Sequence, residues 1–108
     1  MVKKAYPKAR KNILTDDSWL LQQLRILGNN IRKLRKYYKI TQAELSTDIL
    51  LGAANNGLIS CKERCTTNKV QKSIAYFTTI DLLLISKHFN VSIDDLFNGN
   101  FPGGKDDN

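Results

Sequence analysis

Side chains that could contact the bases and phosphates of a nucleic acid gather between residues 39 and 69 of this chain. Gln42, Asn55 and Asn56 carry amides, and an amide can donate and accept hydrogen bonds together across the N6 and N7 edge of adenine. The cations that flank these amides are Lys39, Lys62, Arg64 and Lys69. Phosphate contacts position a protein on a duplex and base contacts give it specificity, so this combination points to nucleic-acid binding.

No set of residues in the chain predicts catalysis or a metal site. Cys61 and Cys65 are the only cysteines and His88 is the only histidine, whereas structural zinc needs four ligands. Both thiols fall within one helical turn, where disulfide geometry fits poorly, so we expect them to be reduced. The sequence offers no nucleophile with a histidine partner and no glycine loop that could cradle a phosphate. We therefore expect a protein that is not an enzyme and that holds no cofactor and no metal.

Charge is distributed unevenly along the chain. Residues 1–72 carry 15 basic and 5 acidic side chains (+10), and residues 73–108 carry 2 basic and 5 acidic ones (−3), which together give the net charge of +7. A polyanionic partner would therefore meet the first part of the chain.

Residues 1–14 contain Pro7 and no apolar period, which predicts a flexible basic N-terminal arm that lies along phosphates or enters a minor groove. The cations of this arm are Lys3, Lys4, Lys8, Arg10 and Lys11.

Hydropathy and the N-terminal sequence bear on where the protein works. No apolar run approaches the length that a bilayer-spanning helix needs. The N-terminus carries charge but is not followed by an apolar segment, so the sequence does not predict a secretory signal. We expect a cytoplasmic protein that does not interact with membranes.

The first helical region follows the cap residues at 15–18. Apolar residues then recur at spacings of three and four, which predicts a helical stripe. The stripe consists of Leu20, Leu24, Leu27, Ile31, Leu34 and Tyr38. Gly28, Asn29 and Asn30 interrupt the good helix formers. We expect them to separate an N-terminal helical extension, residues 16–26, from the helix that follows.

Cap residues mark the remaining helices. Thr41 precedes a helix expected over residues 42–50, which Gly52 ends. Asn55 or Asn56 caps a third helix that reaches residue 64 or 65. Thr78 or Thr79 caps a helix over residues 80–89 that Asn90 ends, and Ser92 caps a short helix over residues 93–97. In the helix over residues 80–89, the side chains expected to point inward are Leu82, Leu83, Ile85 and Phe89.

Two segments of the chain lack a clear helical pattern. Residues 66–78 are compatible with an extended segment, a short helix or a loop, and residues 99–108 suggest a flexible tail. The chain therefore predicts an all-α fold, a compact bundle of five to six helices over residues 15–98.

Three motifs carry a resemblance to a known family. They are Ile31-Arg32-Lys33-Leu34-Arg35, Thr41-Gln42-Ala43-Glu44-Leu45 and Val91-Ser92-Ile93-Asp94-Asp95-Leu96-Phe97. In this order, over residues 27–97, the chain resembles the lambda-repressor-like (XRE) family of helix-turn-helix DNA-binding proteins. It departs from the family pattern in a longer stretch between Gln42 and Glu63 and a longer link from Glu63 to the next helix. The resemblance implies a lambda-repressor-like domain whose third helix enters the major groove.

The register of the third helix stays open at this point. If Ile59 is its buried anchor, Asn55 is the cap and the groove-facing residues are Asn56, Gly57, Leu58 and Cys61. If Leu58 is the anchor, Cys61 joins the core and the DNA-facing residues are Asn55, Asn56, Gly57 and Ser60. The resemblance adds Gln42, next to its cap Thr41, as a contact to phosphate or to a neighbouring base-reading side chain. It also marks Arg35 as a structural position.

The resemblance, together with the basic charge, implies a sequence-specific regulator of transcription that binds double-stranded DNA. The resemblance implies a homodimer on a palindromic operator and a repressor of phage, plasmid or mobile-element type. The surfaces expected to join two copies are Trp19–Ile26 or the region around Phe97 and Phe101. Two alternatives remain, the DNA-binding antitoxin of a toxin–antitoxin pair and a basic helical module that binds RNA or protein.

Overall fold

The computed structural model describes residues 19–51, 56–66 and 74–105. In this part of the chain the backbone forms five α-helices and one π-helical turn, and it contains no strand beyond an isolated bridge residue, Ile74. The predicted all-α class is therefore confirmed for the described residues. The predicted basic arm, residues 1–14, lies outside them.

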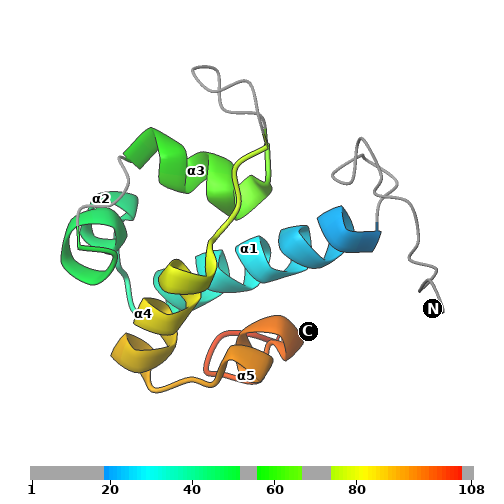
Figure 1. Cartoon of the computed structure of the whole chain (residues 1–108). Coiled ribbons are helices and arrows are strands. Elements are labelled where there is room, and N and C mark those ends of the chain that lie inside the picture. The colour runs from blue at the N-terminus through cyan, green and yellow to red at the C-terminus, as the bar shows by residue number, and fades with distance from the viewer. Residues whose placement is uncertain (1–18, 52–55, 67–73, 106–108) are drawn as a thin grey trace, which may run out of the picture.

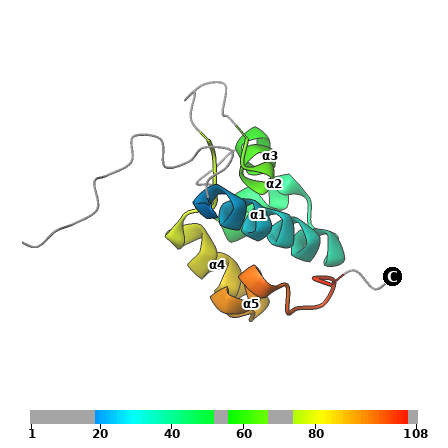
Figure 2. The same ribbon diagram turned by 90° about the vertical axis from the view of Figure 1, so that its right-hand side faces the viewer.

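The helices pack around a long first helix. This helix, α1 (Trp19–Tyr37), is followed by α2 (Gln42–Glu44), the π-helical turn η1 (Leu45–Ile49), α3 (Asn56–Arg64), α4 (Thr79–Phe89) and α5 (Ile93–Asn98). Both views show α1 in the middle, with α2 and α3 on one side and α4 and α5 on the other (Figures 1 and 2). The core draws apolar side chains from every one of these elements except the short α2: Leu27, Ile31, Leu34, Leu45, Ile49, Leu50, Ile59, Phe77, Ile85, Val91 and Leu96.

The predicted division of the first helix is wrong, because α1 runs without interruption through Gly28, Asn29 and Asn30. The backbone of α3 lies directly against Gly28, where an added Cβ would stand 2.6 Å from the carbonyl oxygen of Glu63. Asn30 is buried, and its side-chain amide donates to the carbonyl oxygens of Leu96 and Phe97 near the end of α5, at 2.7 and 3.1 Å. The last carbonyls of a helix have no partner within it, so Asn30 satisfies groups that would otherwise lack one. Gly28 and Asn30 therefore serve packing between helices and do not break α1.

The second helical segment begins as predicted and then widens. Thr41 caps α2 through a reciprocal pair of 3.0 Å hydrogen bonds with Glu44, a capping box. From Leu45 to Ile49 the turn is π-helical, and the amide of Leu50 donates to the carbonyl of Leu45 at 2.9 Å. The prediction of one regular helix over residues 42–50 is therefore corrected to a short α-helix followed by a π-helical turn.

The last two helices have the predicted caps. Thr78, and not Thr79, caps α4, again in a capping box, here with Asp81. Asn90 ends α4 in the left-handed conformation, and Ser92 caps α5. One inward assignment is wrong, since Leu83 is 56% exposed.

The chain continues past α5 with local structure where a tail was predicted. Gly99 ends α5 with a φ of 73°. The next residues form hydrogen-bonded turns, and Phe101 packs against the core. The described part of the predicted tail, residues 99–105, therefore belongs to the packed domain.

Candidate nucleic-acid interface

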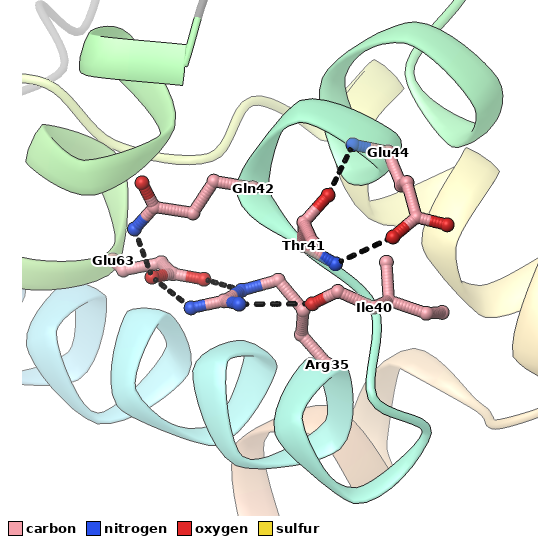
Figure 3. A network of polar contacts seen from close by, with 6 residues as sticks. All are labelled: Arg35, Ile40, Thr41, Gln42, Glu44 and Glu63. Carbon is pink, nitrogen blue, oxygen red and sulfur yellow. Dashed lines mark hydrogen bonds and ion pairs between the residues drawn. The ribbon is translucent and has the colours of Figure 1, made fainter.

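A buried ion pair fixes α3 to α1 and α2. The guanidinium of Arg35 on α1 donates to both carboxylate oxygens of Glu63 on α3, through Nε at 2.7 Å and Nη2 at 3.1 Å. The Gln42 amide, at the start of α2, donates to the same carboxylate at 3.2 Å, and Arg35 also donates to the carbonyl of Ile40 at 2.9 Å (Figure 3). A bidentate arginine–carboxylate pair constrains both groups geometrically. One carboxylate thus joins the three helices, and the structural role expected of Arg35 is confirmed.

The two sides of α3 differ in burial. Ile59 is fully buried, and Lys62 and Glu63 are also buried, so the inward side follows the helical spacing of three and four residues. On the opposite side Arg64 is exposed, and Ser60 and Cys61 are half-buried. Of the two registers that the sequence left open, the one with Ile59 as the buried anchor therefore fits.

Leu58 does not behave fully as that register predicts. Its side chain is half-buried and packs against the core, so it is not simply a groove-facing residue. The described outward side of α3 therefore consists of Ser60, Cys61 and Arg64.

The prediction that Lys62 contacts phosphate is wrong. Its ammonium lies 2.7 Å from the carboxylate of Asp81 on α4, and the two side chains are 10% and 5% exposed. Because the charge is already paired inside the protein, it is not available to a phosphate. Lys62 lies three residues after Ile59 and so falls on the inward side of α3, but the sequence alone left open whether Ile59 or Leu58 is the buried anchor.

The predicted contacts at the start of α2 lie on the same side of the domain as α3. Gln42 is half-buried and already hydrogen-bonded to Glu63, so it joins the positioning network. Thr41 is exposed and is used as a cap, and its hydrogen bonds to Glu44 lower the pKa of the Glu44 carboxyl. Lys39 is exposed in the turn between α1 and α2, where its φ of 57° ends α1 in the left-handed conformation. Of these three residues, Lys39 is the one whose charge is open to a phosphate.

Several predicted residues lie beyond what the structure describes. Asn55, Lys69 and the arm cations Lys3, Lys4, Lys8, Arg10 and Lys11 are outside the described residues. Asn56 and Gly57 belong to the first turn of α3, and the burial of both residues lies outside what the structure describes.

The two cysteines are free thiols in different surroundings. Cys65 is buried, and this burial raises the pKa of its thiol, while the nearby cation of Arg25 opposes the shift. Cys61 is half-buried on the outward side of α3. Among the described residues, no group of three or more histidine, cysteine, aspartate or glutamate side chains is placed to hold a metal ion. No described helix has the length and apolarity needed to cross a membrane.

Two residues that fix α3 were missed in the sequence. Asp81 could have been recognised in part, because a carboxylate three residues after Thr78 is the signature of a capping box. Its second role, as the partner of Lys62, joins residues 19 positions apart and has no local signal. The contact between Gly28 and α3 likewise depends on a helix crossing that the sequence does not display.

We compared the chain with known protein families, proteins and structures. No family model, no curated protein and no solved structure matches the chain.

Proposed function

We propose that the protein is a sequence-specific regulator of transcription that binds double-stranded DNA and places α3 in the major groove. The observation that carries the proposal is the arrangement of α2, η1 and α3. The Arg35–Glu63–Gln42 network holds α3 beside α2 and against α1, and the outward side of α3 keeps Ser60, Cys61 and Arg64 away from the core. A helix held at the periphery of a domain with one free side is what the recognition helix of a helix-turn-helix requires.

Charge supports a DNA partner. The positive excess of the chain lies in residues 1–72, which carry 15 basic and 5 acidic side chains (+10) and include these helices. Exposed Lys39 and Arg64 are the described candidates for phosphate contacts, and Lys69 and the basic arm are candidates from the sequence. Ser60 and Cys61 in α3, with Asn55, Asn56 and Gly57 at its start, are the candidates for base contacts.

A homodimer on a palindromic operator, acting as a repressor, is the form of this function that the resemblance favours. Of the two surfaces considered for dimerisation, the one on α1 is open, since Trp19 is 71% and Ile26 45% exposed. Phe97 and Phe101 pack against the core of their own chain and are less available. Sedimentation of the wild type and of Trp19→Ser would show whether this end of α1 joins two copies.

The function is tested by selecting binding sites from randomised duplex DNA at near-physiological salt. We expect one enriched motif with two half-sites. The double variant Asn55→Ala/Asn56→Ala should lose roughly 1–3 kcal/mol for each good base contact removed, while its non-specific binding stays. Asn29→Ala makes the same chemical change at an exposed position on α1 and serves as the matched control. Binding without any enriched sequence, fading as salt rises, would refute the proposal and favour the RNA or protein-binding alternative.

A further inference from the structure

Residues 62 and 63 of α3 carry opposite charges, and both are buried, with 8% of Lys62 and 4% of Glu63 exposed. Glu63 pairs with Arg35 on α1, whereas Lys62 pairs with Asp81 on α4. The backbone of the same two residues lies against Gly28, where an added Cβ would stand 2.7 and 2.6 Å from their carbonyl oxygens. Three separate contacts thus hold α3 at this one point.

The Lys62–Asp81 contact also fixes the chain that follows α3. The Asp81 oxygen that accepts from Lys62 also accepts from the Thr78 amide, at 2.9 Å, and so belongs to the cap of α4. The Lys62 ammonium lies 5.8 Å from the centre of the buried Phe77 ring, within the range of a cation–π contact. Lys62 therefore ties α3 to the start of α4 and to the residues just before it.

The pair has a geometric effect that an apolar contact would not have. Removing two charges from water carries a desolvation cost, so a buried ion pair is weak evidence of added stability compared with packed apolar side chains. It does impose direction, because a charged donor and acceptor 2.7 Å apart tolerate little change in distance or angle. Together with Arg35–Glu63, which pulls the adjacent residue toward α1, it limits rotation of α3 about its own axis.

We propose that Lys62 and Asp81 are positioning residues for DNA reading: without contacting DNA, they set the rotation of α3 and so the angle at which Ser60, Cys61 and Arg64 face it. This inference rests on the proposed function for its DNA-binding consequence. The rotation of α3 itself can be measured without DNA.

The first experiment compares Lys62→Met with Arg64→Met, which removes a similar charge from the exposed side of the same helix. Binding to the selected duplex and to a random duplex is measured over a range of salt concentrations. We expect Lys62→Met to lower the ratio of specific to non-specific affinity roughly tenfold or more and to leave the salt dependence of binding unchanged. Arg64→Met should weaken both affinities alike and reduce the salt slope by about one charge.

Loss of folding is controlled with a second variant. Lys62→Met leaves the Asp81 carboxylate buried without its partner, so Lys62→Met/Asp81→Asn removes both charges and retains an amide oxygen that can accept from Thr78. This double variant should fold and should show the same loss of specificity. A folded double variant with the wild-type affinity ratio would overturn the proposal.

The second experiment uses residual dipolar couplings of the backbone amides in the free protein, which report the orientation of α3 relative to α1. We expect a reorientation of α3 in both Lys62 variants and none in Arg64→Met. Unchanged couplings in the Lys62 variants would show that the pair does not position α3. If the wild type selects no DNA sequence, the proposed function fails, while the couplings still decide whether the pair orients the helix.

Discussion

Replacement of Gly28 by alanine should destabilise the protein although it places a better helix former in the middle of α1. By helix propensity alone the change is favourable by about 0.8–1 kcal/mol. In the structure, however, the new Cβ would lie 2.6 Å from the carbonyl oxygen of Glu63 and 2.7 Å from that of Lys62. Both atoms belong to the backbone of α3, so no side-chain rotation can relieve the overlap.

The expected magnitude follows from the balance of these two effects. Relief requires α1 and α3 to separate, which strains the Arg35–Glu63 pair that joins them. Overpacking of a well-packed interior typically costs about 1–3 kcal/mol. After the gain in propensity, the net loss in the free energy of unfolding should be about 1 kcal/mol, and at the upper end about 2 kcal/mol.

Urea denaturation followed by circular dichroism measures this loss, and Asn29→Ala is the matched control. Asn29 is the adjacent residue on the same helix and is exposed, so alanine there should raise stability by a few tenths of a kcal/mol, up to about 0.7 kcal/mol. The two neighbouring substitutions should therefore have opposite signs. If Gly28→Ala stabilised the protein as much as Asn29→Ala, the close contact between α1 and α3 would be wrong.

Three further results are expected. Arg35→Ala leaves the Glu63 carboxylate buried without its cation, and it should lower the free energy of unfolding by about 3–5 kcal/mol in chemical denaturation. Thr41→Ala removes the hydroxyl that caps α2, at a cost of roughly 0.5–2 kcal/mol, and in an NMR titration should raise the lowered pKa of Glu44 only in part, because the backbone amide of residue 41, the larger cause of the lowering, still donates to that carboxyl. In the wild type, the stability from the capped Glu44 carboxylate is present above about pH 4.5 and is lost as the pH falls through its lowered pKa. Because burial raises the pKa of Cys65 above 9.0, its maleimide labelling should be slow, and its contribution to stability should fade as the pH rises through the raised pKa.

Each of these results has an internal control. Arg32→Ala removes an exposed arginine from α1 and should change stability by no more than about 0.5 kcal/mol. Thr79→Ala, next to the cap of α4, should leave the pKa of Glu44 unchanged. The half-buried Cys61 should label faster than Cys65, as Cys65→Ser and Cys61→Ser would show separately. Equal stability of the two arginine variants, or faster labelling of Cys65, would contradict the burial on which these expectations depend.

Helix limits were predictable where a local signal sets them. The caps at Thr41 and Ser92 and the stop at Asn90 each depend on residues within one turn, and the structure confirms them. The candidate site was predictable only up to the register of the third helix. The sequence placed Ile59 and Leu58 as alternative anchors of the third helix, and the choice between them required knowing what α3 packs against.

The errors arise where one residue type serves two purposes. Gly28 and Asn30 suggest a helix break by propensity, yet both make contacts between helices that are distant in sequence. Lys62 and Arg64 are both basic residues of α3, but Lys62 is buried against Asp81 and Arg64 is exposed. Leu83 is apolar and still lies at the surface, because α4 buries only part of its circumference. Burial depends on the whole fold, so these assignments needed the structure.

The most direct test of the account is an NMR titration of isotopically labelled protein with a short duplex. If α3 is the helix that meets DNA, the largest changes in amide chemical shift should fall on Asn55, Asn56, Ser60, Cys61 and Arg64, with smaller changes at the start of α2. The amides of α5, on the opposite side of α1, should change little (Figure 1). Changes centred on α5, with α3 unaffected, would contradict the proposed DNA-binding surface.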